Sequence, residues 1–164
     1  MPCAHAATWK CRVNKTDTPP MLAAWIRENA DRLEALTHVT IVDDALPDAV
    51  PEIKALYESL MAAEREKGHN WSDPAASKTL HQLIPGLFVM WDTNILPFAD
   101  DYGDFTLEMH RLGLRLIEEG PYATSEELEQ RLQEHLGDGV RKTIAKYLDE
   151  LNWYVMVGAA RAAR

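Results

Sequence analysis

The sequence predicts an all-α fold in a single compact domain. Apolar residues recur mostly three and four positions apart, which is the spacing of a helix that buries one face. Proline and glycine separate these stretches, and hydroxyl or carboxylate residues precede several of them, as at helix starts. About six or seven helices account for the pattern. Residues 18–164 are expected to form the domain, and residues 1–17, which show no period, an irregular N-terminal arm.

The first half of the chain contains two long helical stretches. The first begins at Thr18, a hydroxyl residue that precedes two prolines, and its apolar stripe continues to Leu36. Residues 38–43 are either one short strand or part of an extended connection. The next helix is expected to open at Pro51 and to stop near Gly68.

A short helix is expected to follow from Asp73 to a Pro-Gly break at Pro85. The apolar run at 87–92 comes next, and a solvated acidic turn is expected at 100–104. Leucine, methionine and phenylalanine cover much of the circumference of the helix predicted over 105–117. This helix is therefore expected to be central.

Two helices complete the predicted domain. Thr124 and Glu127 fit a capping box, in which each side chain accepts a hydrogen bond from a backbone N–H near the other. The last amphipathic stretch covers 140–155. We expect Trp153 and Tyr154 near its end to lie in the core or at its rim.

Charge and cysteine content exclude several classes of protein. The chain has 164 residues, with 17 Lys plus Arg against 26 Asp plus Glu, a net charge of -9. Non-specific coating of nucleic acid needs the opposite surplus. The two cysteines exclude a disulfide scaffold and favour a reducing compartment. No stretch is apolar enough to cross a membrane, and the first residues lack the apolar core of a signal peptide. The sequence thus favours a soluble, cytoplasmic protein.

Metal binding has one weak candidate near the start of the chain. Cys3, His5 and Cys11 offer three zinc ligands, but no CxxC pair accompanies them and no fourth ligand is identified. An ordinary flexible arm is the stronger interpretation. We therefore expect neither a metal nor a cofactor.

The densest chemical signal lies between residues 76 and 95. Lys78 stands near the start of the short helix, and the apolar run after the Pro-Gly break leads to Asp92. Phe88 and Trp91 would surround a partly desolvated Lys–Asp pair. A lysine in such surroundings can act as an amine nucleophile that forms Schiff bases.

Two structural alternatives remain for the same residues. Lys78 and Asp92 can form a purely structural ion pair, or Asp92 can cap a helix that begins at Thr93. His81, one turn after Lys78, lies on a neighbouring face of the helix.

This segment resembles small bacterial proteins related to the helix-hairpin-helix DNA glycosylases. The resemblance rests on the order Ser77-Lys78, Leu80-His81, Pro85, Phe88 and Trp91-Asp92. In those glycosylases a lysine attacks the sugar C1′ and an aspartate assists departure of the base. The resemblance implies that Lys78 is the nucleophile and Asp92 the assisting carboxylate. The glycine-rich phosphate-binding turn of the family has no counterpart here, since residues 73–76 read Asp-Pro-Ala-Ala.

Three functions follow from these features. The first is an enzyme that cleaves or binds an N-glycosidic substrate, a nucleoside or a flipped, damaged base, with substrate contacts from His81, Phe88, Trp71 and Trp91. The second is a non-catalytic domain that binds a small molecule or a protein. The third is a module whose acidic surface docks onto a basic partner. None of them involves a membrane.

We predict no measurable binding to undamaged duplex DNA at physiological salt, that is, a Kd weaker than about 10⁻⁴ M. The surplus of acidic side chains repels phosphates, and the one basic cluster, at Arg141, Lys142 and Lys146, is too small to offset it. Fluorescence anisotropy with a labelled duplex at low and high salt measures this. Micromolar affinity with a steep salt dependence would contradict the prediction.

Overall fold

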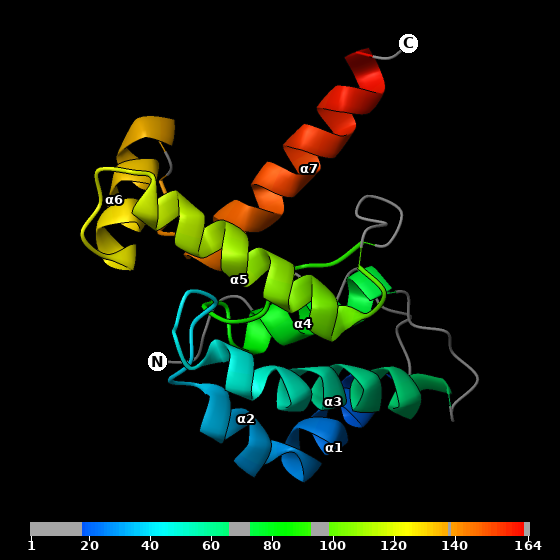
Figure 1. Ribbon diagram of the computed structural model, residues 1–164. Helices are drawn as coiled ribbons and strands as arrows, with labels where there is room; N and C mark the ends of the chain where they lie inside the picture. The colour runs from blue at the N-terminus through cyan, green and yellow to red at the C-terminus, as the bar shows by residue number, and fades with distance from the viewer. Residues whose placement is uncertain (1–17, 66–72, 93–98, 138, 163–164) are drawn as a thin grey trace.

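The protein, described here by a computed structural model, is built from helices, with its longest connection between α4 and α5 (Figure 1). The structure describes residues 18–65, 73–92, 99–137 and 139–162. Within these ranges there is no strand, and seven helices are formed: α1 (Thr18–Glu28), α2 (Ala30–Leu36), α3 (Leu46–Arg65), α4 (Asp73–Leu83), α5 (Tyr102–Glu118), α6 (Ser125–Leu136) and α7 (Ile144–Ala162). The predicted all-α class is confirmed. The N-terminal arm and the helix end near Gly68 lie outside the described residues.

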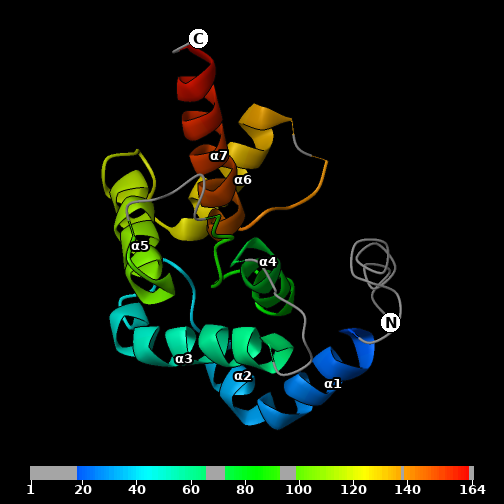
Figure 2. The same ribbon diagram turned by 90° about the vertical axis from the view of Figure 1, so that its right-hand side faces the viewer.

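Helix α3 is the base of the molecule. It packs against α1, α4 and α5, while α7 packs against α5 and α6. Figure 1 shows α1, α2 and α3 at one end, with α5 crossing above them and α7 rising away from the body. The second view shows α4 between α3 and the base of α7 (Figure 2). None of the described helices has the length and apolar character that crossing a membrane requires.

The helical stretch predicted to run without a break to Leu36 is divided at Asn29. The Asn29 Nδ2 donates to the Trp25 carbonyl at 2.9 Å, and its Oδ1 accepts from Arg32 Nη1 at 2.8 Å. The Asn29 N–H still donates to the Trp25 carbonyl at 3.0 Å, but Asn29 has φ −109° and ψ 15°, which lies outside the α-helical region. Helix α1 therefore ends at Glu28, and α2 begins as a separate helix at Ala30.

The connection from α2 to α3 consists largely of turns, such as the one closed by the Asp43 N–H on the Thr40 carbonyl at 3.1 Å, so neither the strand nor the extended connection predicted for 38–43 forms. One backbone hydrogen bond on one side and one side-chain hydrogen bond on the other hold it in place, instead of the repeated backbone hydrogen bonds of a β-sheet. The Ile41 N–H donates to the Gly86 carbonyl at 2.9 Å, and the Ile41 carbonyl is hydrogen bonded to His110 Nδ1 at 2.8 Å. This connection thus joins the Pro-Gly turn to α5.

Helix α3 begins at Leu46, earlier than the predicted start at Pro51. Asp43 organises this start, because its Oδ1 accepts from the Ala45 N–H and its carbonyl from the Leu46 N–H, both at 2.9 Å. Pro51 lies inside the helix, where a proline removes one backbone hydrogen bond and its ring crowds the carbonyl of residue 47, but the remaining backbone bonds and the packing of α3 outweigh this local cost. The helix therefore tolerates Pro51.

The acidic turn predicted at 100–104 is in fact the start of α5. Asp101 is the N-cap, and its Oδ1 accepts from the N–H groups of Gly103 at 2.7 Å and Asp104 at 3.0 Å. Lys54 of α3 binds the other oxygen of Asp101 at 2.6 Å. The hydrogen bond from Lys54 lowers the pKa of Asp101 and raises that of Lys54. This cap therefore ties α5 to α3.

Helix α5 is central, as predicted. It buries Phe105 and Met109 of the predicted stripe. Gly113 is required where α5 meets the α2–α3 connection, because a Cβ there would lie 2.6 Å from Val42 Cγ1.

The capping box of α6 is confirmed. The Glu127 N–H donates to Thr124 Oγ1 at 3.2 Å, and Glu127 Oε2 accepts from the Ala123 N–H at 3.0 Å. The helix ends at Gly137, which adopts φ 68°, a left-handed conformation that favours glycine.

Helix α7 differs from its prediction at both ends. It begins at Ile144, and Val140 lies before it with 69% of its surface exposed. Thr143 precedes the helix, accepts from the Lys146 N–H at 3.3 Å and donates to the Pro85 carbonyl at 2.7 Å. Trp153 and Tyr154 are 54% and 73% exposed, so they do not belong to the core. Their apolar spacing predicts a helix but does not indicate whether the body reaches that far.

We predict that Trp91→Ala lowers the free energy of unfolding by about 3–5 kcal/mol, because it empties a buried aromatic site in a close-packed core. Urea denaturation measures this change. Leu136→Ala, at a position exposed on α6, is the control and should change stability little. An unchanged melting temperature in Trp91→Ala would show that this segment is not central.

Candidate functional site

The predicted site is built around residues 87–92, called here the buried segment. It follows the Pro-Gly turn after α4 and has no regular secondary structure. Four of its side chains are nevertheless buried: Leu87, Phe88, Val89 and Trp91. An irregular chain in a core presents N–H and carbonyl groups that secondary structure cannot pair.

Side chains of the adjacent helices bind these backbone groups. His81 Nδ1 of α4 is hydrogen bonded to the Phe88 carbonyl at 2.6 Å. The Tyr102 hydroxyl, from the first turn of α5, donates to the Val89 carbonyl at 2.8 Å. The buried segment is therefore fixed from two helices.

Ser77 of α4 binds the end of the buried segment in both directions. Its Oγ accepts from the Trp91 N–H at 2.9 Å and lies 3.2 Å from the Trp91 carbonyl, to which it donates. We call this pair of hydrogen bonds the Ser77–Trp91 clip. Lys78 and Asp92 each directly follow one of its two residues in the chain.

The two predicted catalytic residues differ in exposure. Lys78 is exposed on α4, and Asp92 is half-buried after Trp91. Among the ion pairs of the described residues, none joins them. The helix that Asp92 was considered to cap, beginning at Thr93, lies outside the described part of the chain.

His81 is held in the neutral form. Burial lowers its pKa, the charge of Lys146 on α7 lowers it further, and the hydrogen bond to Phe88 and the charge of Asp149 oppose the shift. Because the Phe88 carbonyl accepts from Nδ1, the proton is assigned to Nδ1. This leaves Nε2 as an acceptor. His81 thus has a structural role, and its part as a substrate contact stays a prediction.

Trp91 lies in an aromatic cluster with one unpaired polar atom. Its ring is 5.9 Å from Tyr57 and Tyr102 and 5.8 Å from Phe105, between ring centroids. The indole Nε1 is buried and has no hydrogen-bond partner among the residues that the structure describes. A buried donor without an acceptor costs on the order of 1–3 kcal/mol, so this atom is a position where a ligand acceptor would gain affinity.

Of the remaining predicted substrate contacts, one lies within the described residues and one lies outside them. Phe88 is buried within the core, and Trp71 lies outside the described residues. With Phe88, Trp91 and His81 buried, a substrate in contact with them requires the site to open. Their role as substrate contacts remains a prediction.

The sequence does not predict the structural roles of Ser77 and Tyr102. Ser77 is part of the resemblance alone, and Tyr102 lies in the predicted acidic turn. The sequence carries one signal: a hydroxyl residue, Ser77, lies within a short predicted helix that a Pro-Gly break separates from an apolar run.

The basic cluster is neutralised by neighbouring acids. Each of its three cations has an acidic partner: Arg141 pairs with Glu129 at 3.6 Å, Lys142 with Glu150 at 2.9 Å, and Lys146 with Asp149 at 2.6 Å. It therefore offers little free positive charge to a phosphate backbone. The described residues contain no group of three or more His, Cys, Asp and Glu side chains that could hold a metal ion. The zinc candidate at Cys3 lies outside them.

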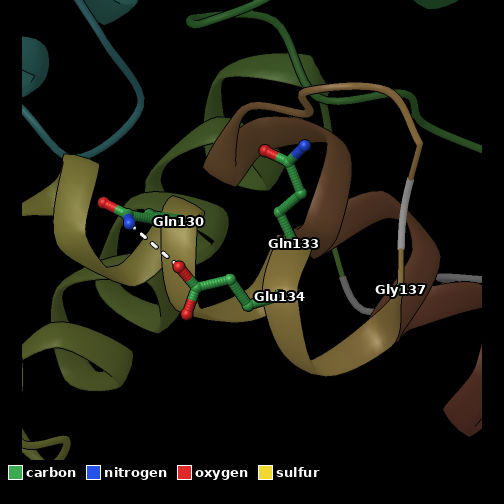
Figure 3. A pocket seen from close by; sticks show the side chains of 4 residues that line it. All are labelled: Gln130, Gln133, Glu134 and Gly137. Atoms are coloured by element: carbon green, nitrogen blue, oxygen red, sulfur yellow. Dashed lines mark hydrogen bonds between the residues drawn. The ribbon is translucent and has the colours of Figure 1, made fainter.

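An open hollow lies away from this site, at the end of α6 (Figure 3). It is lined by Gln130, Gln133, Glu134 and Gly137. The Gln130 amide donates to Glu134 at 2.9 Å across its floor. Its described lining contains neither a lysine nor an aromatic side chain, so it does not supply the predicted chemistry.

We predict that His81 makes the fold acid-sensitive. Its folded pKa lies below the ordinary value of 6.5, so the unfolded chain binds the proton more readily and stability falls as the pH drops below 6.5. His81→Asn keeps a donor for the Phe88 carbonyl and removes the titration. Between about pH 7 and pH 5, urea denaturation should therefore show a smaller loss of stability in this variant than in the wild type. Equal losses would contradict the assignment.

None of the protein-family models, curated proteins and solved structures compared with this chain matches it. The glycosylase resemblance therefore depends on the short segment from Ser77 to Asp92. Its chemistry is a matter for proposal and experiment.

Proposed function

We propose that the Lys78 face of α4 and the adjoining end of the buried segment form a site that acts on an N-glycosidic bond, in a nucleoside or a damaged base. Lys78 is the nucleophile and Asp92 the assisting carboxylate. The observation that carries the proposal is the Ser77–Trp91 clip, with distances of 2.9 and 3.2 Å. It joins two chain segments at the residues that immediately precede the two reactive groups.

The two residues differ in exposure, and Lys78 lies at the surface instead of in the partly desolvated surroundings that the sequence predicts. Lys78 is exposed, so its amine is accessible to a sugar carbon of a substrate bound at the surface. Asp92 is half-buried, and a carboxylate that is partly shielded from water interacts more strongly with a developing positive charge. The fixed backbone on both sides reduces the freedom lost on binding.

The proposed reaction is a balanced displacement. The neutral Lys78 amine attacks C1′, and the C1′–N bond breaks with its electron pair on the leaving base. Asp92 stabilises the oxocarbenium-like charge, accepts a proton from the new ammonium group and passes it to the base. The sugar ring then opens as its O4′ takes the remaining N–H proton, which leaves a C1′=Nζ Schiff base. Water hydrolyses this bond and restores Lys78.

Charge favours a small or single-stranded substrate over an intact duplex. The chain is strongly acidic, and the basic cluster is paired with Glu129, Asp149 and Glu150. A nucleoside brings no phosphate backbone to be repelled. A single-stranded base binds largely by stacking on aromatic rings, which does not depend on net charge.

A second function, a non-catalytic domain that binds a small molecule, is favoured by one observation. The Trp91 Nε1 is a buried donor without an acceptor in the described part of the chain, and a ligand carbonyl or ring nitrogen would satisfy it. Such binding needs neither Lys78 nor a covalent step. The two functions therefore differ in their dependence on the lysine.

We predict that borohydride traps a covalent adduct between the protein and an abasic oligonucleotide, since the Lys78 amine condenses with the sugar aldehyde and the reductant fixes the imine. Lys78→Ala and Lys78→Arg should both lose the adduct. Lys78→Arg is the matched control, because it keeps the positive charge and lacks the nucleophile. Denaturing electrophoresis measures the adduct.

Asp92→Asn separates an effect on catalysis from an effect on folding, when base release and stability are both measured on this variant. Asparagine is itself a good helix cap, so the change should cost about 1 kcal/mol of stability at most. Base release from damaged or nucleoside substrates should be abolished. Absence of any adduct and of base release in the wild type would exclude the enzyme, while an adduct that survives in Lys78→Arg would show that another amine reacts.

A further inference from the structure

We propose that the projecting part of α7, residues 151–162, is an interface through which two copies of this chain associate in antiparallel orientation. The inference is independent of the proposed glycosidic activity. It rests on the exposed apolar side chains of this segment, on its place in the fold and on the distribution of charge along the chain.

The first half of α7 is anchored in the body and the second half is not. Ile144, Tyr147 and Leu148 are buried, and Asn152 Nδ2 contacts Met109 Sδ of α5 at 2.9 Å. Beyond that contact the helix continues to Ala162. In both views this end of α7 stands clear of the other helices (Figures 1 and 2).

The side chains that follow the anchor are apolar and exposed. Trp153, Tyr154 and Val155 are 54%, 73% and 54% exposed, and Leu151 is 37% exposed. Consecutive residues of a helix lie about 100° apart, so the side chains of residues 153–155 cover roughly 200° of its circumference. Single exposed apolar residues are ordinary, but a contiguous group marks an interaction surface. A helix that is apolar over so much of its circumference is normally covered.

The charge distribution identifies a second copy as the partner. From Leu151 onward the sequence contains no acidic residue and two arginines, Arg161 and Arg164, so all 26 acidic side chains precede this segment. The segment is thus complementary in charge to the rest of the same chain. An antiparallel pair with its two-fold axis between Val155 and Met156 brings position 161 of one helix level with Glu150 of the other, a carboxylate that also pairs with Lys142 and Lys146 of its own chain. Such an interface is self-complementary, as a two-fold dimer requires.

A lipid bilayer fits this segment less well. The uninterrupted apolar run covers 153–160, which is about 12 Å of helix against a hydrocarbon core of about 30 Å. The strongly acidic body would also be repelled by an anionic surface. A second copy supplies both an apolar face and the acidic groups.

Sedimentation-velocity centrifugation of the full chain from about 1 to 100 µM tests the proposal. The wild type should dimerise within this range, and Tyr154→Glu should weaken the dimer by at least about tenfold. Arg161→Glu should weaken it too, and added salt should reduce the wild-type affinity. Val140→Glu is the control, at an exposed apolar position outside α7, and should leave the dimer unchanged. Thermal unfolding of each variant checks that the monomer still folds.

A wild type that remains monomeric at the highest concentration would overturn the proposal. So would a Val140→Glu effect equal to that of Tyr154→Glu, because the association would then be non-specific. Sedimentation with phosphatidylcholine vesicles is the second arm of the experiment. A monomer that binds these vesicles and loses binding in Tyr154→Glu would identify lipid, instead of a second copy, as the partner.

Discussion

Backbone groups of the buried segment set the constraint on which the rest of the structure depends. A chain that passes through a core without helix or strand leaves N–H and carbonyl groups that cost on the order of 1–3 kcal/mol each when unpaired. The Ser77 hydroxyl accepts from the N–H of residue 91. His81 and the Tyr102 hydroxyl bind the carbonyls of residues 88 and 89, respectively. The preceding Pro-Gly turn extends the same arrangement, since its carbonyls accept from the α2–α3 connection and from the residue before α7. Helices α4, α5 and α7 are thus positioned around one irregular segment.

The same contacts that stabilise the fold position the candidate site. The Ser77–Trp91 clip brings the start of α4 to the end of the buried segment, and Lys78 and Asp92 are its direct neighbours in sequence. Burial keeps His81 neutral, and its Nδ1 is hydrogen bonded to the Phe88 carbonyl, although that bond by itself raises the pKa. A change at Ser77 or His81 therefore acts on the fold first, and only substitutions at Lys78 and Asp92 address the chemistry separately.

Local signals predicted the fold well, and non-local contacts limited the prediction. The α6 capping box depends on residues three apart, so the sequence was sufficient to identify it. The division at Asn29 depends on the backbone conformation of one residue, and the start of α3 before Pro51 on hydrogen bonds to Asp43, neither of which periodicity detects. The exposure of Trp153 depends on where the body ends. At the candidate site, the sequence identified Lys78 and Asp92 as candidates but not the partners of the backbone between them, because pairing of Ser77 with Trp91 is a contact of the folded chain.

Amide hydrogen exchange at Trp91 tests the central claim most directly. Exposed loop amides exchange through local fluctuations, whereas core amides exchange only when the whole domain unfolds. If Ser77 holds the Trp91 N–H as described, this amide should be protected as strongly as that of Met109 in the centre of α5, although it belongs to no helix or strand. NMR exchange measurements on the full chain give both rates. Exchange at Trp91 several orders of magnitude faster than at Met109 would show that the buried segment is an ordinary loop and would contradict this account.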